Sequence, residues 1–94
     1  MLIRWSPTAA EGLSRISTYI RQDNASAAEH VVKTIYDSAG SLESFPYRGR
    51  VGRVDGTREL VLPSLPFVIV HRVLEDAVEI AGVLHGAQRW PPEG

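Results

Sequence analysis

The stretch "FVIVHRVLEDAVEIAGVLH", residues 67–85, decides the fold of this chain. Its two runs, residues 67–74 and 78–85, are rich in valine, isoleucine and leucine, and the short break "EDA" separates them. Runs of β-branched residues between turn residues are typical of strands. Residues 57–62, "TRELVL", form a third such run ahead of the break "PSLP". The sequence therefore predicts three antiparallel strands in a meander, and the nearly continuous apolar character of the middle run indicates a central strand.

Alternate residues of the last predicted strand point to opposite faces of the sheet. One set consists of Val78, Ile80, Gly82 and Leu84. The other set consists of Glu79, Ala81, Val83 and His85. We expect the first set to face the helices, which places His85 on the opposite, open face.

The residues before this meander predict a short strand followed by a helical hairpin. "LIRW" is apolar and β-compatible, and Ser6-Pro7 then supplies an N-cap and a proline at the first helical position. The first helix is expected to end near Gln22, and the second to begin around residues 24–26 and to end before Pro46. Apolar residues recur at helical spacing in both: Ala9, Leu13, Ile16 and Ile20, then Ala28, Val31, Ile35, Ala39 and Leu42. The alanines favour close packing of two antiparallel helices.

The length and element order define the expected fold class. A chain of 94 residues is enough for one core, so we expect a single α+β domain over residues 1–94. It contains an N-terminal strand, a helical hairpin and a three-stranded antiparallel meander (β-α-α-β-β-β). We expect the four strands to form one antiparallel sheet with the helices on one side. No apolar run reaches the roughly 20 residues that span a membrane, and the N-terminus does not resemble a signal peptide, so a cytoplasmic protein is expected.

The composition excludes several kinds of site. The chain has no cysteine, which rules out disulfides and thiolate zinc sites. The three histidines, His30, His71 and His85, lack the spacing of metal ligands. The glycines of "GRVGRVDG" fit neither a dinucleotide-binding nor a P-loop pattern, and there is no Gly-x-Ser-x-Gly nucleophile motif. We therefore expect neither a metal nor a cofactor.

The segment "YRGRVGRVDGTRELV", residues 47–61, concentrates positive charge in a chain whose formal net charge is −1. It contains Arg48, Arg50, Arg53 and Arg58, and we call it the arginine segment. Its glycines predict a mobile loop leading into the sheet, which would contact a phosphate backbone or an acidic protein surface. The alternative is a solvated turn in a chain that uses nine arginines and one lysine.

Four stretches in this order resemble one known superfamily: "WSPTAAEGL", "SLESFPYRGRVGRVDGTRELVL", "PFVIVHRV" and "VLHGAQRWP". Together with the predicted element order, they are similar to the RelE/ParE superfamily of bacterial type II toxin-antitoxin systems, over essentially the whole chain. The resemblance implies a toxin that is held inactive by a cognate antitoxin in a hetero-oligomeric complex. The ParE-like branch poisons DNA gyrase, and the RelE-like branch cleaves messenger RNA in the ribosome.

Two residues are candidates for chemistry if the chain is a nuclease. Metal-free RNA cleavage needs a proton acceptor, a proton donor and cations that stabilise the charged phosphorane. By resemblance, Arg58 in "TREL" occupies a position where RelE-like enzymes carry a catalytic arginine; the alternative is a surface arginine, paired with Glu59 or another acid. Histidine is a common general acid or base, so His85 is a candidate for that role; the alternative is a structural role. Because the acid-base set looks incomplete, we favour a gyrase poison over a ribosome-dependent nuclease, and a degenerate, non-toxic member is the third reading.

The other candidate residues would contact the target or the antitoxin. They are Arg48, Arg50, Arg53, Arg72, Gln88, Arg89 and Trp90. Arg72 and its neighbour His71 point to opposite sides of the central strand, and the sequence leaves open which of them lies near the open face. Trp90 either stacks on a partner or closes the edge of the core. An extended, partly acidic antitoxin segment is expected to cover the positive surface by helix-in-groove packing or strand addition.

Overall fold

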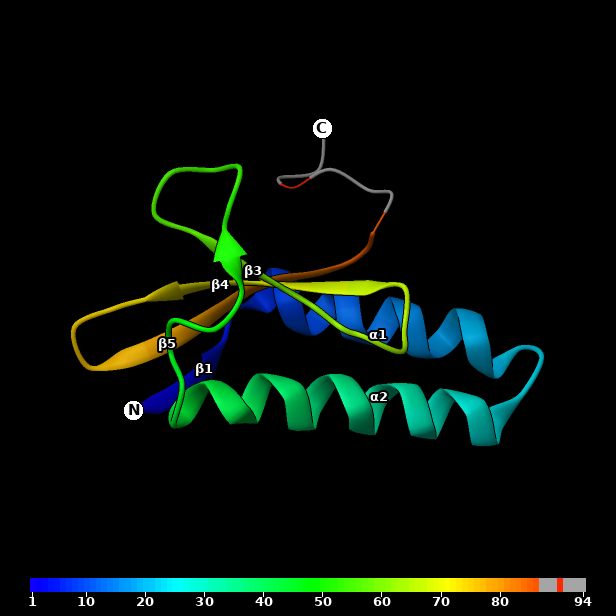
Figure 1. The fold of residues 1–94 in the computed structure, drawn as a ribbon. Coiled ribbons are helices and arrows are strands. Elements are labelled where there is room, and N and C mark those ends of the chain that lie inside the picture. Colours follow the sequence, from blue (N-terminus) through cyan, green and yellow to red (C-terminus); the bar gives the residue numbers. More distant parts are fainter. Residues whose placement is uncertain (87–89, 91–94) are drawn as a thin grey trace.

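The computed structural model describes residues 1–86 and 90, and it has the predicted order of elements (Figure 1). The elements are β1 (Leu2–Trp5), α1 (Pro7–Arg21), α2 (Ala25–Gly40), a short 3-10 helix η1 (Ser41–Glu43), β2 (Arg50–Val51), β3 (Arg58–Val61), β4 (Phe67–Val73) and β5 (Ala77–His85). The fold is α+β, as expected from the alternation of strand and helix patterns. No helix in the described part of the chain is long and apolar enough to cross a membrane.

Both helices begin at side-chain caps that the sequence predicts. The Ser6 hydroxyl accepts a hydrogen bond from the Ala9 N–H at 3.1 Å, and the Asn24 side chain accepts one from the Ala27 N–H at 3.0 Å. Such caps satisfy backbone donors that have no partner inside the helix. The helix boundaries therefore lie within a few residues of the expected positions.

The sheet contains five strands in the order β1-β5-β4-β3-β2. The antiparallel meander of β3, β4 and β5 is confirmed. The expectation of four antiparallel strands was wrong in two respects: the two-residue strand β2 adds an edge beside β3, and β1 pairs with β5 in parallel. The helical hairpin and the meander return the chain to the β1 edge in the original direction, which is why the first and last strands run parallel.

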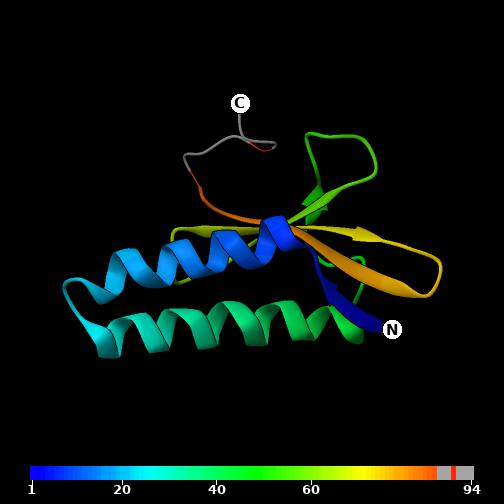
Figure 2. The same cartoon turned by 180° about the vertical axis from the view of Figure 1, so that it is seen from behind.

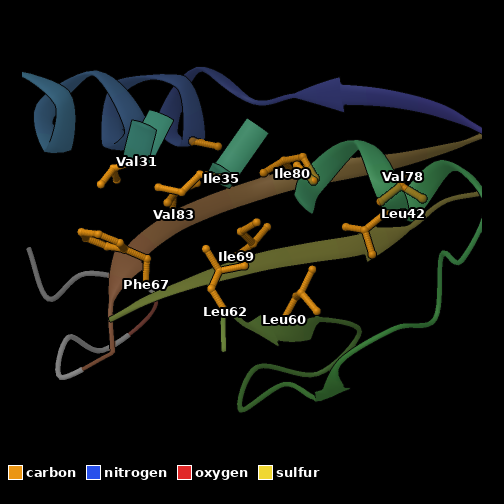
Figure 3. Packing of buried hydrophobic residues seen from close by; sticks show 12 residues of the cluster. Val31, Ile35, Leu42, Leu60, Leu62, Phe67, Ile69, Val78, Ile80 and Val83 are labelled. Carbon is orange, nitrogen blue, oxygen red and sulfur yellow. The ribbon is translucent and has the colours of Figure 1, made fainter. Parts of the chain in front are cut away.

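The core lies between the sheet and the two helices, which cover the same face (Figures 1 and 2). Figure 3 shows buried side chains of both layers pointing toward one another. From the helices and η1 they include Val31, Ile35 and Leu42, and from the strands and their connections Leu60, Leu62, Phe67, Ile69, Val78, Ile80 and Val83. The predicted helix stripes therefore form one wall of the core.

A bulge in β5 changes the direction of the residues that follow it. Val70 lies opposite Gly82, but the next residue of β4, His71, lies opposite Ile80, so Ala81 is left without a partner. The extra residue shifts the alternation by one position. The prediction that Gly82 and Leu84 face the helices was therefore wrong: Val83 is in the core cluster instead.

The same shift moves His85 away from the open face. Residues directly opposite one another on neighbouring strands share a face of the sheet. His85 lies opposite Phe67, whose side chain is part of the core cluster on the helix side. The expected position of His85 on the open face was therefore wrong.

Candidate functional site

Arg58 and His85 share the helix-facing side of the sheet but occupy opposite ends of it. Arg58 lies opposite His71 of β4, and His85 lies opposite Phe67 of the same strand. Four residue steps along β4 correspond to roughly 13 Å. The buried side chain of Ile69 lies between them. The structure does not bring these two side chains to one site.

The guanidinium of Arg58 is bound within the protein. Its Nη2 atom donates a hydrogen bond to the Gly49 carbonyl at 3.1 Å, and its Cζ atom lies 5.9 Å from the centre of the Tyr47 ring. Its Nε atom is buried and has no hydrogen-bond partner among residues 1–86 and 90. These contacts hold residues 47–49 against β3.

His71 of the neighbouring strand β4 also binds a backbone carbonyl of the arginine segment. Its side chain is fully buried, and its Nε2 atom donates a hydrogen bond to the Arg48 carbonyl at 3.1 Å. Burial lowers the pKa of His71, the bond to the Arg48 carbonyl opposes this, and the charge of Arg58 lowers it further. Neutral His71 therefore carries its proton on Nε2, and its buried Nδ1 has no hydrogen-bond partner in the described part of the chain.

Arg58 and His71 thus bind two consecutive carbonyls, those of Gly49 and Arg48. We call them the loop anchors. The anchoring role of His71 could not be identified from the sequence, because the sequence left open which way the central-strand histidine points. A histidine inside an otherwise apolar strand was the only signal.

Glu59 fixes the other side of the arginine segment. Its carboxylate accepts hydrogen bonds from Arg50 Nε at 3.1 Å, from Arg50 Nη2 at 2.9 Å and from the Arg53 N–H at 3.1 Å. Burial alone would raise the pKa of Glu59, but the bonds from Arg53 and Arg50 and the charges of both arginines lower it. Glu59 pairs with Arg50, not with Arg58, because adjacent residues of β3 point to opposite faces.

The tip of the arginine segment is a tight hairpin that projects from the sheet on the side away from the helices (Figures 1 and 2). The Thr57 N–H bonds to the Val54 carbonyl at 3.1 Å, and Gly56 has a φ of 82°. Positive φ at the third residue of such a turn favours glycine. The expected mobile loop is therefore a hydrogen-bonded hairpin.

Large apolar side chains lie exposed beside the anchors. A turn closed by the Arg48 N–H and the Phe45 carbonyl at 3.1 Å carries Tyr47. Tyr47 is 66% exposed and Val51 of β2 is 78% exposed. They line a hollow of about 230 Å³ together with Gly56, Thr57, Arg58 and Val73. Sequence reasoning singled out the arginines of this segment and missed its apolar residues.

Arg72 and Trp90 meet on the open face. The Arg72 guanidinium lies 5.4 Å from the centre of the Trp90 ring, and its Nη1 atom lies 3.4 Å from a carboxylate oxygen of Glu79. The Trp90 indole covers Gly82, where an added Cβ would collide with it. Arg72 is therefore the residue of the Arg72–His71 pair that lies on the open face. The candidates Gln88 and Arg89 lie outside the described residues.

A second surface lies at the other end of the sheet, between α1 and the β3–β4 connection. This apolar groove has a volume of about 560 Å³. Its lining includes Ile16, Tyr19 and Ile20 of α1, Leu65 and Phe67, and Val83 and His85 of β5. No residue lines both this groove and the hollow beside Tyr47. The exposed ring of Tyr19 and the edge-on contact of His85 with Phe67 at 6.0 Å form part of its wall.

The described residues thus present two candidate binding surfaces, the apolar groove and the hollow beside Tyr47. Among the described residues, no three His, Asp or Glu side chains are grouped as metal ligands. The β-α-α-β-β-β fold, with an anchored arginine segment at one end and an apolar groove at the other, is that of a RelE/ParE-like toxin. The model of the family described as the ParE toxin of type II toxin-antitoxin systems, parDE, matches residues 3–90. The chain belongs to this family.

Individual relatives agree with this assignment. The chain is 43% identical to a candidate toxin, Y4kP of Sinorhizobium fredii, over 95% of this chain and 92% of that protein. It is 33% identical to Toxin RelE2 of Caulobacter vibrioides, over 89% of this chain and 93% of that protein. A solved structure of the chromosomal ParDE system from P. aeruginosa has a TM-score of 0.83 and 25% identity, covering 90% of this chain and 95% of that one. The chain is thus the toxin of a type II toxin-antitoxin pair, and its partner is a cognate antitoxin.

Proposed function

We propose that this toxin acts in the cytoplasm as a binding poison of DNA gyrase. The observation that carries the proposal is the separation of Arg58 from His85. A nuclease must place its cation and its proton-transfer groups around one phosphate. Arg58 is instead engaged with the Gly49 carbonyl, and His85 lies at the far end of the sheet in the wall of the groove. A poison that acts by binding needs no such set.

Ribosome-dependent cleavage of messenger RNA is the alternative. Such a nuclease would need a proton donor and a proton acceptor near Arg58, in addition to the residues described above. His71 is adjacent but fully buried, and its Nε2 proton is committed to the Arg48 carbonyl. The surroundings of Arg58 therefore favour a toxin that binds gyrase over one that cleaves RNA.

We further propose that the antitoxin inserts an amphipathic helix into the apolar groove. Such helices bind by placing apolar side chains of one face into a groove. The walls of the groove are apolar along α1 and the β3–β4 connection, with Arg15 and His85 among the lining residues. A partly acidic helix would contact Arg15 while its apolar face packs on Ile16 and Tyr19.

The target is tested by a pulse of expression without antitoxin. In the same cells, messenger RNA ends are mapped and gyrase-linked DNA breaks are counted. We expect DNA breaks with intact messages. New RNA ends at codon-defined positions, abolished by Arg58→Ala, would instead establish a nuclease. Unimpaired growth would leave only a degenerate toxin that retains the fold.

The groove is tested with Tyr19→Glu, a change at a side chain that is 74% exposed. The added charge should weaken binding of the cognate antitoxin by about tenfold or more, because a carboxylate would be desolvated in an apolar contact. Tyr36→Glu is the matched control, since Tyr36 is 60% exposed on α2 and does not line the groove. Calorimetric titration of the purified toxins measures both affinities, and equal binding by Tyr19→Glu would contradict the proposal.

A further inference from the structure

The hollow beside Tyr47 is a second apolar surface with no partner in the described part of the fold. Phe45, Tyr47 and Val51 are 63%, 66% and 78% exposed. Isolated apolar side chains on a surface need no explanation. Tyr47 and Val51, however, line one hollow together, and Phe45 lies two positions before Tyr47 in the chain. Exposed aromatic and apolar side chains grouped in this way are typical of a protein contact.

The backbone under these side chains is held in place on both sides. The loop anchors Arg58 and His71 bind the carbonyls of Gly49 and Arg48. On the other side, Glu59 binds Arg50 and the Arg53 N–H. A surface whose loop is already ordered loses little conformational entropy when a partner binds. The exposed side chains are therefore presented in a fixed arrangement.

The segment that contains the hollow is positively charged: Arg58 lines the hollow, and the exposed Arg48 and Arg53 lie in the same segment. The Arg48 guanidinium donates a hydrogen bond to the Ser41 hydroxyl at 3.0 Å. Within residues 1–86 and 90, Arg48, Arg53 and Arg58 take part in no ion pair with a carboxylate, whereas Arg50 pairs with Glu59. Asp55 at the hairpin tip is the one acidic residue of the arginine segment besides Glu59. A partner that is complementary to this surface presents carboxylates around an apolar centre.

We propose that this surface, which consists of Tyr47, Val51, Val73 and Arg58 around the hollow and the exposed Arg53 two positions after Val51, docks an acidic patch on the target protein, with one apolar side chain of the target in the hollow. The proposal rests on the proposed function, since it assigns the target-binding surface of the same toxin. It also separates the two partners, because the antitoxin groove lies at the opposite end of the sheet.

A nucleic acid fits this surface less well than a protein does. Nucleic-acid binding is dominated by neutralisation of phosphates by lysine and arginine side chains. The arginine segment offers three uncompensated arginines beside an acid. Val51 cannot stack on a base, and the hollow of about 230 Å³ has the size for a single apolar side chain.

The test uses Tyr47→Ser and Val51→Ser in the full chain. Their matched controls are Tyr36→Ser and Val61→Ser, exposed residues of the same types that do not line the hollow. Three quantities are measured for each: growth arrest on expression without antitoxin, affinity for purified gyrase, and affinity for the cognate antitoxin. A cooperative thermal unfolding transition, measured without any partner, shows separately that each variant is folded.

We expect Tyr47→Ser and Val51→Ser to lose about tenfold or more in gyrase affinity, and to lose growth arrest in parallel, as central contact residues do. Antitoxin affinity and both controls should stay at the wild-type level. Arg53→Glu should weaken gyrase binding most at low salt, because a rim charge acts through long-range attraction.

Each other outcome overturns a different statement. If the wild type binds gyrase and the loop variants, Tyr47→Ser and Val51→Ser, bind it equally well, this inference is overturned and the proposed function stands. Loop variants that lose antitoxin binding assign the surface to the antitoxin instead. A wild type that binds RNA, with a salt slope lowered by Arg48→Ala and Arg53→Ala but not by Val51→Ser, makes the partner a nucleic acid. If the wild type does not bind gyrase but the loop variants no longer arrest growth, the gyrase proposal fails. The assignment of this surface to a target protein then stands. A non-toxic wild type that binds no gyrase overturns both.

Discussion

At the scale of single residues, identical side chains have different roles because their surroundings differ. His71 and His85 share one face of the sheet, but His71 is fully buried beneath the arginine segment and His85 is exposed at the groove. The same holds for Arg50 and Arg58, which lie within one hairpin. Arg50 pairs with a carboxylate, and Arg58 binds a backbone carbonyl. Residue type alone therefore does not identify a catalytic group in this chain.

The buried His71 predicts a loss of stability in acid. Its pKa is lowered by burial in the folded state, so the unfolded chain binds the proton first as pH falls. The stability that it contributes is present above the unfolded pKa of about 6.5 and is lost as pH falls through the lower folded pKa. The free energy of unfolding is measured by urea denaturation between about pH 7.5 and about pH 5.5. His71 should contribute at most about 1.4 kcal/mol per pH unit to its decrease as the pH falls.

His71→Gln separates this effect from other acid-sensitive groups. Glutamine can still donate a hydrogen bond to the Arg48 carbonyl but does not titrate. The variant should therefore lose the His71 part of the pH slope. His30→Gln, at an exposed position of α2, should keep the wild-type slope. An unchanged slope in His71→Gln would show that His71 is not held neutral in the fold.

At the scale of elements, the position of α1 depends on a close approach to β5. A Cβ added at Gly12 would lie 2.9 Å from the Val83 carbonyl oxygen, which is a backbone atom and cannot rotate away. Glycine therefore allows the helix to lie against the strand. Gly40, near the end of α2, has open space around its Cα, and its φ of −60° is helical.

These two glycines predict opposite effects of the same substitution. Alanine favours a helix by up to about 1 kcal/mol over glycine. Gly40→Ala should therefore raise the free energy of unfolding by about 0.5–1 kcal/mol. Gly12→Ala should lower it by about 1–2 kcal/mol, since overpacking against β5 outweighs the gain. Chemical denaturation of both variants measures the difference, and a stabilised Gly12→Ala would contradict the close packing.

The sequence predicts elements well here and the relations between them less well. Caps, apolar spacing and β-branched runs are local, and they indicate both helices and the meander correctly. The parallel pairing of β1 with β5 depends on contacts between distant residues. The bulge at Ala81 adds one residue inside an apolar run in which either alternation looks plausible. That single residue moves His85 to the other face, which is why the expected site could not be assembled from the sequence.

At the scale of the whole molecule, the two candidate binding surfaces occupy opposite ends of the sheet. The apolar groove lies beside the β3–β4 connection, and the hollow lies beside the arginine segment. Both rest on the same core, so a partner bound to either one stabilises the entire fold by mass action. A stability measurement therefore detects binding at either end, and variants of one surface show which end is involved.

Antitoxin binding should raise the melting temperature of the toxin. At a free concentration of about 100 times Kd, a ligand adds about 2.7 kcal/mol, which for a domain of this size corresponds to about 10–20 °C. Differential scanning fluorimetry should give the same shift for Tyr47→Ser as for the wild type and a smaller shift for Tyr19→Glu. A shift lost in Tyr47→Ser would show that the antitoxin reaches the arginine segment.

The pairing of β1 with β5 also has a consequence for the time at which the toxin is made. β1 is the earliest of the five strands to be synthesised, and β5, which pairs with it from Ala77 to Ile80, is the last. Long-range pairing of this kind waits until both partners have left the ribosome. The helices cannot complete their core before β5 emerges, because β5 supplies Val78, Ile80 and Val83. We therefore expect a chain still under synthesis to be harmless, and the toxin to become active in one step when its translation is nearly finished.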